Sequence, residues 1–515
     1  MNKSFLLLLF LITVCLDTLH ANGPDTLVIQ KKLIKSDRPA VSFRSLVFDN
    51  PSMRYSMQNF SLTTISLNGW HRRKDQGALI QEGDGSTLGQ IDVFSFVALD
   101  SLNRLFGSAS YSNGRVENMR WNENLDLSVI HPYVIGDSIG GFMKKERYNF
   151  SGGYTHRFNN WRVGGELDYL AQIGYRDIDP RPQNITSDLS IKASVSRALG
   201  RCYDFGTSFY LRKYHQRSHI SFRNDKGSTS VYQMLGLGMD YTRFAGTQFS
   251  AKYNGWGMGI SIDLIPLKEN MVSSGWSVSL QTDLFNLSKD LDGISTEPLN
   301  TLRDLNFGLE ASWIKESHNF NYGVKLLSCW RMRNGYESLF GEPIGATYPL
   351  LSRIRQYQKK ESQIGLYGLL QHQLLESQNW DWKVMPRVVL SRMDVDHLSA
   401  RRWVDMAHVE GGVDLQARWR KKSWLITPYC GLGYQTNLGS KHQLPGLNEN
   451  SSIGQMIIHD IKALSNNRFL FDLTLRVDYQ VTSNYGFLFL TRWSHTVYEA
   501  YGKTNTLELS LGINF

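Results

Sequence analysis

The sequence has no long hydrophobic run after its first 21 residues, and this absence excludes membrane-spanning helices. Such a helix needs about 20 consecutive, mostly apolar residues, and no later stretch approaches that length. Proline is scarce, with 13 residues in 515. Because proline cannot donate to a strand ladder, its scarcity favours long paired strands. The mean hydropathy of −0.32 is low for a membrane protein, but it is typical of a barrel in which half of each strand is polar.

Cysteine is also rare, and it shows neither a disulfide framework nor metal-ligand spacing. Of the four cysteines, Cys15 lies in the N-terminal apolar segment, while Cys202, Cys329 and Cys430 are isolated and odd in number. The 13 histidines are scattered, without HExxH or a comparable motif. We therefore expect no metal, no cofactor and no catalytic site, and we expect the three later cysteines to be buried or lipid-facing.

The net charge of +9 is spread along the chain without a block of lysine or arginine. No basic motif with interleaved aromatic residues is present, so we expect no nucleic-acid partner. A surplus of positive charge is compatible with a pore that prefers anions.

The N-terminus has the pattern of a signal peptide, which predicts export. Residues 1–21 combine Lys3, an apolar core at residues 5–14 and Ala21 at a plausible cleavage point. The apolar core is too short to span a bilayer. Cys15 raises a lipoprotein alternative, but Val14 before it fits that signal poorly.

The C-terminus reads as an amphipathic strand that ends in an aromatic residue. Apolar side chains alternate with polar ones, and in a strand such alternation places them on opposite faces. The apolar positions are Leu507, Leu509, Leu511, Ile513 and Phe515. This strand alone is also compatible with a soluble sandwich. It resembles the signal that the outer-membrane barrel-assembly machinery recognises, so we expect that machinery and outer-membrane lipid as partners.

The same alternation recurs along most of the chain, in runs such as 161–175, 305–313, 413–420 and 469–480. These runs are longer than the ordinary strand of about 5–6 residues, whereas a membrane-crossing strand needs about 9–11. Aromatic residues, which settle at membrane interfaces, make up 12% of the chain.

Connections between these runs alternate in length, which is the layout of an outer-membrane barrel. We expect tight turns at 159–160, 200–201, 317–318, 378–379, 421–422 and 483–484, and long loops at 71–86, 114–146, 215–229, 332–360, 393–403 and 438–467. The prediction is an all-β, antiparallel up-and-down transmembrane barrel over residues 61–515. It has short periplasmic turns, long extracellular loops and about 18–20 strands, within a range of about 14–22. The strand pattern is least regular in the glycine-rich stretch 242–272, where the glycines are compatible with a tight loop or a bulge.

Residues 22–60 are polar and weakly periodic, and we interpret them as a periplasmic N-terminal extension. Residues 25–29, DTLVI, resemble the TonB box through which energised transporters contact an inner-membrane motor. Because the strand pattern begins near Ser61, we expect no room for a plug domain before the barrel. Contact with an uptake complex stays open.

Two segments carry a family resemblance: residues 148–156, YNFSGGYTH, leading to Trp161, and residues 175–189, YRDIDPRPQNITSDL. They resemble an uncharacterised family of Gram-negative outer-membrane β-barrel proteins. The resemblance implies the fold, a location in the outer membrane and a link to nutrient uptake, but it assigns no site residues.

The second segment crowds charges around two prolines just past a strand end. Arg176, Asp177, Asp179 and Arg181 surround Pro180 and Pro182. One interpretation is a loop that folds into the lumen as a constriction held by arginine–carboxylate pairs; the other is a solvated surface turn.

An enzymatic alternative rests on His219 and Ser221, with Asn224 nearby. These residues distantly resemble the histidine–serine pair of barrel phospholipases, and they would share one strand face. The stretch 215–224 is loop-like and its flanks do not match, so we do not expect an enzyme.

The leading hypothesis is a channel or transport-associated barrel for solute uptake across the outer membrane. The alternatives are a non-conducting structural or partner-binding barrel of an uptake complex and, least favoured, a barrel enzyme. The lumen-facing residues mix both charges with hydroxyls and amides, which is compatible with a hydrated path and equally with a lumen closed by salt bridges.

Overall fold

The computed structural model describes residues 28–75, 79–224, 230–246, 249–292, 297–345, 347–372 and 379–515. In this part of the chain, one antiparallel sheet of eighteen long strands and the two-residue strand β12 closes into a barrel. The predicted all-β up-and-down barrel is thereby confirmed, with a strand number inside the predicted range. The expected signal peptide at 1–21 lies outside the described residues.

Each long strand pairs with its neighbour in sequence. The first nine are β1 (Leu62–Lys74), β2 (Gly85–Ala98), β3 (Asn103–Met119), β5 (Gly141–Phe158), β6 (Trp161–Tyr175), β7 (Arg181–Leu199), β8 (Tyr203–Ser221), β11 (Phe249–Lys268) and β13 (Gly275–Leu291). The remaining nine are β14 (Asn300–Glu316), β15 (Phe320–Phe340), β16 (Leu350–His372), β17 (Trp380–His397), β18 (Arg402–Lys421), β19 (Trp424–Gln443), β20 (Arg468–Gln480), β21 (Gly486–Tyr498) and β22 (Gly502–Asn514). The short β12 (Met271–Val272) continues the turn after β11.

Pairing of β1 with β22 closes the barrel. The register places Leu67 opposite Leu511. Beyond the end of β22, the Phe515 amide donates to the Thr63 carbonyl at 2.8 Å, and the Thr63 amide returns a bond of 3.2 Å. The terminal aromatic residue therefore takes part in the seam between the first and last strands.

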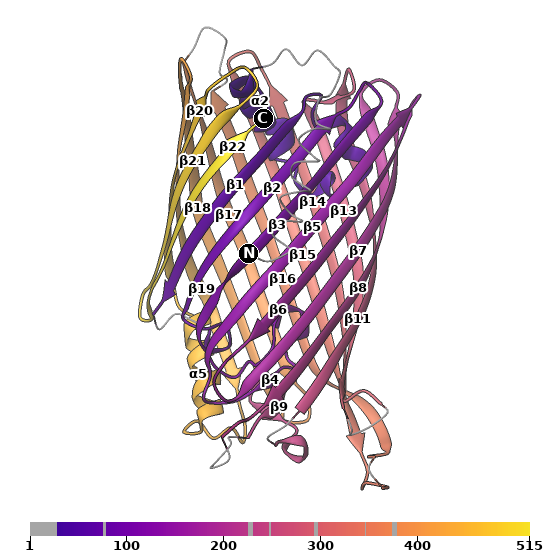
Figure 1. Cartoon of the computed structure of the whole chain (residues 1–515), viewed down its shortest axis with the longest axis vertical. Helices are drawn as coiled ribbons and strands as arrows, with labels where there is room; N and C mark the ends of the chain where they lie inside the picture. Colours follow the sequence, from indigo (N-terminus) through magenta and orange to yellow (C-terminus); the bar gives the residue numbers. More distant parts are fainter. Residues whose placement is uncertain are drawn as a thin grey trace.

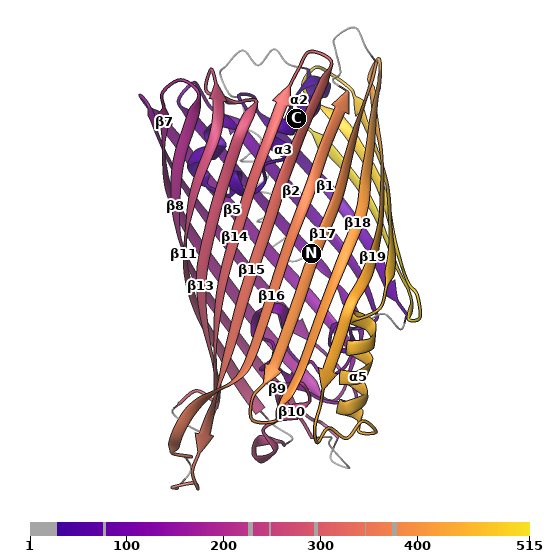
Figure 2. The same cartoon turned by 180° about the vertical axis from the view of Figure 1, so that it is seen from behind.

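The barrel has two distinct ends (Figures 1 and 2). One end, called here the short-turn end, carries the C-terminus and the tight connections. The other, the long-loop end, carries the two-stranded extensions and α5 (Ser452–Leu464). Turns at 159–160, 200–201, 317–318, 421–422 and 483–484 all lie at the short-turn end, as predicted, while residue 378 lies outside the described part.

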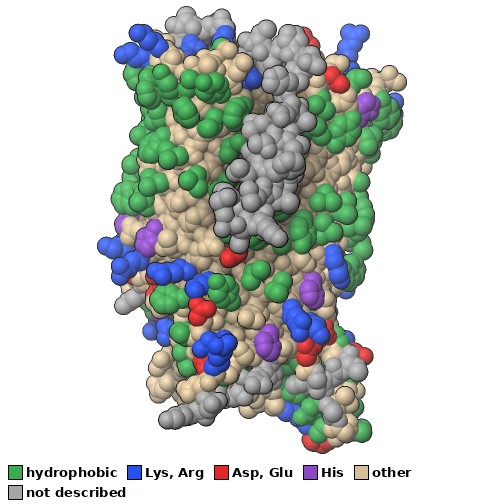
Figure 3. Space-filling model, viewed as in Figure 1, with side chains coloured by type: hydrophobic (Ala, Val, Ile, Leu, Met, Phe, Trp, Pro, Cys, Tyr) green, Lys and Arg blue, Asp and Glu red, His purple; other side chains and the backbone are tan. Residues whose placement is uncertain are grey.

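The outer face of the barrel carries an apolar band. Hydrophobic side chains gather over the part of the wall nearer the short-turn end, and charged side chains become frequent toward the long loops (Figure 3). Exposed aromatic residues border the band at two levels. Those at the short-turn end include Trp161, Trp276, Trp380, Trp424 and Phe487, and those farther along the strands include Tyr169, Trp256, Trp330, Phe469 and Trp493. Amphipathic rings at two levels are typical of the two interfaces of a membrane.

No helix in the described ranges is both long and apolar enough to cross a membrane.

Several strands extend farther than the sequence predicted. β15 and β16 cover most of the predicted loop 332–360, and β8 runs through to Ser221 inside the predicted loop 215–229. The reason is that these extensions lie beyond the apolar band. Their outward side chains face water, so the apolar–polar alternation that marks a membrane strand is lost although the backbone ladder continues.

The stretch 242–272 contains a regular strand at the place where a loop or bulge was considered. β11 pairs with β8 and β13 without a shift of register. Its glycines face the lumen and admit large neighbours: a Cβ on Gly255 would lie 2.5 Å from the Phe285 ring, and one on Gly259 would lie 2.4 Å from the Tyr210 ring. The glycines therefore make room for packing inside the barrel.

The two faces of β6 provide a direct test of the membrane assignment. Leu167 points outward within the apolar band, whereas Leu170 faces the lumen opposite Asp188. An arginine at the lipid face near mid-membrane costs about 2–4 kcal/mol. We expect Leu167→Arg to lower the free energy of unfolding by that amount in lipid vesicles, measured by tryptophan fluorescence in denaturant. Leu170→Arg is the matched control and should cost less than about 1 kcal/mol; equal losses would contradict the assignment.

Candidate functional site

The short-turn end of the lumen is filled by residues 28–60, called here the plug segment. It contains α2 (Ile29–Ser36), α3 (Pro39–Ser42) and the 3₁₀ turns η1 (Leu46–Asp49) and η2 (Pro51–Ser56). Pro39 and Pro51 begin α3 and η2, a position where a missing amide hydrogen costs nothing. A small apolar core joins the segment to the wall. Its members are Ala40, Val47, Phe48 and Met53 of the plug segment and Ile265, Leu267 and Val272 of β11 and β12.

Arg44 is a fully buried polar anchor of the plug segment. Its guanidinium donates to the carbonyls of Ser273 at 2.8 Å and Gly275 at 2.7 Å and to the Ser312 hydroxyl at 3.3 Å. Burial lowers the pKa of this group to about 10, so it remains charged at neutral pH. Beside it, the Ser45 hydroxyl donates to Glu310 at 3.1 Å.

Further polar contacts join the plug segment to other parts of the wall. Arg54 pairs with Glu166 at 2.9 Å, and Asp37 pairs with Lys383 at 3.2 Å. The backbone of η2 lies directly on β6, because a Cβ on Gly164 would approach the Ser52 nitrogen to 2.6 Å. Only glycine admits so close an approach at this position.

This placement corrects the expectation of a periplasmic extension with no room for a plug. Residues 28–60 lie inside the barrel, because their polar side chains find partners on the equally polar lumenal wall. Of the TonB-box-like residues 25–29, the first three lie outside the described part. Ile29 is buried against Phe60 and Leu62, and its amide donates to the Ser483 carbonyl at 3.1 Å.

The long-loop end is covered by inward-folded connections. Residues 120–140 and 230–246, called here the lid, contain α4 (Leu127–Ile130), η4 (Thr242–Phe244) and a small sheet of β4 (Ile135–Gly136), β9 (Tyr232–Gly236) and β10 (Met239–Asp240). The lid shares a large apolar core with inward side chains of the wall. Its buried members include Trp121, Ile130, Tyr133, Met234 and Phe244 of the lid and Tyr214, Tyr253, Phe285 and Leu302 of the wall.

The α5 helix packs beside the lid on the inner face of β18. Its Ile461 is buried against Val404 and Met406. The neighbouring turn η3 (Ile80–Glu82) is tied to the helix, because the Ile80 amide donates to the Asp460 carboxylate at 3.1 Å.

Arg176 anchors the lid to the end of β6. Its guanidinium lies 2.9 Å from a Glu123 carboxylate oxygen and 3.8 Å from one of Asp137, and all three side chains are buried. Two carboxyls thus face one cation. Burial, and then the neighbouring Asp137, raise the pKa of the Glu123 carboxyl well above its usual range.

The charged segment around Arg176 was predicted to be either an inward constriction or a solvated surface turn, and each interpretation fits part of it. Arg176 points inward and holds the lid, whereas Asp177 is exposed and pairs with Lys144 at 2.5 Å. Asp179 pairs with Arg181 at 2.7 Å near the surface. The predicted segment does not itself form the lid, but its Arg176 anchors residues 120–140 of the lid.

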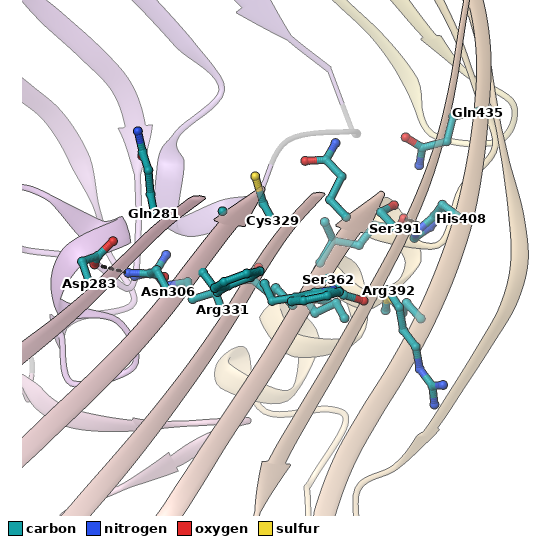
Figure 4. A pocket seen from close by; sticks show the side chains of 18 of the residues that line it. Gln281, Asp283, Asn306, Cys329, Arg331, Ser362, Ser391, Arg392, His408 and Gln435 are labelled. Atoms are coloured by element: carbon teal, nitrogen blue, oxygen red, sulfur yellow. Dashed lines mark hydrogen bonds between the residues drawn. The ribbon is translucent and has the colours of Figure 1, made fainter. Parts of the chain in front are cut away.

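Between the plug segment and α5 lies a chamber of about 590 Å³. Leu46 of the plug segment bounds it on one side, and Leu464 of α5 bounds it on the other. Most of its inward residues have polar side chains, and they come from β13 to β20. The inward residues are Gln281, Asp283, Asn306, Cys329, Arg331, Glu361, Gln363, Ser391, His408, Gln435 and Arg468. Figure 4 shows Gln281, Cys329 and Gln435 on one side of the strand layer, while the Arg392 guanidinium points away.

Salt bridges follow the lumenal wall between neighbouring strands. Arg212 pairs with Asp188 at 2.6 Å, and Arg387 pairs with Asp414 at 2.6 Å and Glu410 at 3.1 Å. These pairs lie along the wall and do not cross the lumen, so they stiffen the wall without filling the chamber.

The cysteines differ from their predicted environments. Cys329 is exposed to the chamber, Cys202 is exposed at the short-turn end, and Cys430 is partly buried. The expectation of buried or lipid-facing cysteines is therefore wrong for Cys202 and Cys329. Period-2 alternation with Trp330 on the outer face would have placed Cys329 inside.

His219 and Ser221 of the enzymatic alternative lie on β8, where the sequence predicted a loop, and Asn224 follows the end of the strand. His219 and Ser221 share a face of β8, but the His219 imidazole bonds the Ser250 hydroxyl at 2.7 Å. The Asn224 amide hydrogen goes to Asp179 at 2.8 Å. That the chain is not an enzyme stays a prediction. Across the described ranges, no three His, Cys, Asp or Glu side chains gather as metal ligands would.

A closed antiparallel barrel with an apolar outer band and a polar lumen defines the class of membrane-spanning β-barrels. Within it, residues 51–515 match a family of unknown function, DUF6850, and the chain belongs to that family. The predicted resemblance to an uncharacterised family of outer-membrane barrels is thus confirmed. No curated protein matches the sequence.

Several solved barrels are similar in fold at very low identity. The ferric preacinetobactin receptor BauA of Acinetobacter baumannii is 9% identical with a TM-score of 0.42, covering 89% of this chain and 80% of that one. The alcaligin receptor FauA of Bordetella pertussis gives 9% and 0.36, with 89% and 76% covered. The CymD monoaromatic hydrocarbon channel gives 9% and 0.31, with 91% of each chain covered. Likeness at this level assigns no cargo.

The Glu123 carboxyl makes lid stability dependent on pH. Because its pKa is raised in the closed lid, closure favours the protonated form, and this contribution is lost as pH rises through the raised pKa. We expect amide hydrogen exchange in residues 120–140, corrected for intrinsic pH effects, to show weaker protection at alkaline pH. Glu123→Gln, which mimics the protonated group, should remove that dependence.

The matched control for this experiment is Glu117→Gln, since Glu117 is only partly buried and pairs with Arg115 at 3.1 Å. It should retain the pH dependence of the unmodified protein. Protection that is constant with pH, or stronger at alkaline pH, would contradict the assignment.

Proposed function

We propose that this chain is an outer-membrane barrel for solute uptake whose lumen is a gated compartment. The observation that carries the proposal is the chamber, lined mostly by polar residues, that lies between the plug segment and α5 in a lumen that the lid covers at its other end. An open diffusion pore has no need of two inward-folded closures. A purely structural barrel has no need of such a chamber.

Orientation follows from the two ends of the barrel. The C-terminus and the tight turns lie at one end, and the long connections lie at the other (Figure 1). In bacterial outer-membrane barrels the short turns are periplasmic and the long loops extracellular. The plug segment then faces the periplasm, and the lid faces the outside.

The two closures differ in their physical character. A large apolar core of nineteen buried residues holds the lid. The plug segment has a smaller apolar core and relies on ion pairs and hydrogen bonds to the wall. Polar contacts exchange with water at modest net cost, about 0.5–1.5 kcal/mol each. The plug segment is therefore the closure that we expect to move first.

The alternative is a non-conducting barrel that binds a partner through its long-loop end. It would keep the same closed lumen, so conductance of the unmodified protein does not separate the two functions. Conductance of a variant with a loosened plug segment does separate them.

Arg44→Met is the sharpest single change to the plug segment. It removes the donor to the Ser273 and Gly275 carbonyls and leaves these acceptors without that partner, which costs about 1–3 kcal/mol. We expect the unmodified protein to be nearly silent in planar bilayers. The variant should show stepwise ohmic openings at least about tenfold more often, the equivalent of 1.4 kcal/mol.

Arg201→Met is the matched control, because Arg201 is exposed at the same end of the barrel. Its conductance should equal that of the unmodified protein. A silent Arg44→Met barrel that is folded and heat-modifiable would overturn the gated compartment and favour the partner-binding barrel.

A further inference from the structure

A second cavity of about 360 Å³ lies between α5 and the lid. It shares Arg331, Glu361, Met393, Met406 and Leu464 with the chamber, so the two spaces adjoin. This cavity, called here the lid cleft, leads from the chamber toward the long-loop end. Its volume falls within the range of sites for small organic molecules.

One wall of the lid cleft is apolar. It is built from the inner faces of β17 and β18 and from the facing side of α5. Its residues are Met393, Val395, Val404, Met406, Ile457, Ile461 and Leu464. This wall offers an aliphatic surface to whatever enters the cleft.

The adjoining strands of the barrel wall supply the cations of the lid cleft, and Lys359 stands directly beside Val395 in the strand register. Arg331 and Arg333 on β15 and Lys359 on β16 line the cleft. Both guanidiniums bind the one Asp304 carboxylate, each with a bond of 2.6 Å. Lys359 lies 2.7 Å from Glu361, so the three cations face two carboxylates.

Arg331 is the most exposed of the three cations, with about a third of its side chain accessible. Arg333 is buried and holds the lid through the His131 carbonyl at 2.5 Å and the Ser128 carbonyl at 2.9 Å. Arg331 also donates to the Ser128 carbonyl, at 3.4 Å, and its buried Nε has no hydrogen-bond partner among the described residues. The exposed part of the Arg331 side chain is therefore the cationic surface that a ligand in the cleft can reach.

Two further acidic residues line the lid cleft. Glu82 pairs with Lys74 at 2.9 Å, and burial raises the pKa of the Asp460 carboxyl, which favours its neutral form. The same three cations lie close to the buried His131. Burial lowers the pKa of His131 to about 3, and the positive charges of Lys359, Arg333 and Arg331 contribute to that lowering.

We propose that the lid cleft binds an amphipathic organic anion: a carboxylate or sulfonate group with an apolar body. The anionic group lies against Arg331, and the apolar body lies against Met406, Ile457 and Leu464. The inference deepens the proposed uptake function by naming the chemical class of its cargo. The site also fits the route of entry, because it lies between the long-loop end and the chamber.

Arg331→Gln tests the cationic wall with little risk to the fold, because Arg333 continues to pair with Asp304. The matched control is Arg492→Gln, which removes a lumenal arginine that pairs with Asp472 and lines neither cavity. Leu464→Gln tests the apolar wall. Each full-length barrel is purified in an uncharged detergent and checked for heat modifiability.

The probes are 4-phenylbutyrate and the neutral 4-phenylbutan-1-ol, titrated calorimetrically. We expect the unmodified protein to prefer the anion by about tenfold, since a charge-assisted bond is worth about 1.5–3 kcal/mol. Arg331→Gln should abolish the preference and leave alcohol binding unchanged, and Arg492→Gln should retain it. Leu464→Gln should weaken both probes alike.

Equal binding of the two probes by the unmodified protein, binding of neither, or equal effects of Arg331→Gln and Arg492→Gln would overturn the proposed site. The titration measures binding to the closed protein and needs no transport. Gated conductance without anion binding would refute this site and leave the uptake function standing. Anion binding in a barrel that never opens would support the site and refute the uptake function.

Discussion

Backbone hydrogen bonds between β1 and β22 turn an eighteen-stranded sheet into a barrel, and without them two strand edges would lie in lipid. Hydrocarbon offers no partner to an unpaired backbone group, so closure is the condition under which strands can span a membrane. Closure also fixes the chemistry of each face. Alternate side chains must be apolar toward the lipid, which leaves the inward positions free for polar and functional groups.

The lumenal face uses this freedom in two ways. Wall residues pair with their neighbours along the barrel, as in the Arg387, Glu410 and Asp414 group, and so stiffen the strands without crossing the lumen. Other wall residues bind segments of the same chain that fold inward, with Arg44 holding the plug segment and Arg176 holding the lid. A polar wall thus supports two closures of different strength and the chamber between them. The physical account of uptake rests on that difference in strength.

Much of the fold could be predicted from the sequence, because the alternation of apolar and polar residues with a period of two identifies membrane strands. The C-terminal strand, the runs at 161–175 and 469–480 and the positions of the tight turns all follow from that pattern. The site was harder to predict, because the plug segment and the lid are irregular and their partners lie far away in sequence. Glu123 and Asp137 meet Arg176 only after a loop of about twenty residues folds inward. The inward direction of Arg331 and Cys329 could have been predicted, because both neighbour Trp330, which faces outward, and successive side chains of a strand point to opposite faces. What surrounds them depends on packing that no local pattern encodes.

Accessibility of the native Cys329 thiol tests the closed chamber most directly. Cys329 faces the chamber, and Ser replacements of Cys202 and Cys430 make it the single reactive thiol after removal of the N-terminal segment that carries Cys15. In vesicles that expose the short-turn end to the reagent, a bulky polyethylene glycol maleimide should leave Cys329 unmodified in the closed barrel, whereas Arg44→Met should allow modification from that side. Rapid modification of the unmodified barrel by the bulky reagent would show a lumen that is open at rest and would contradict the account.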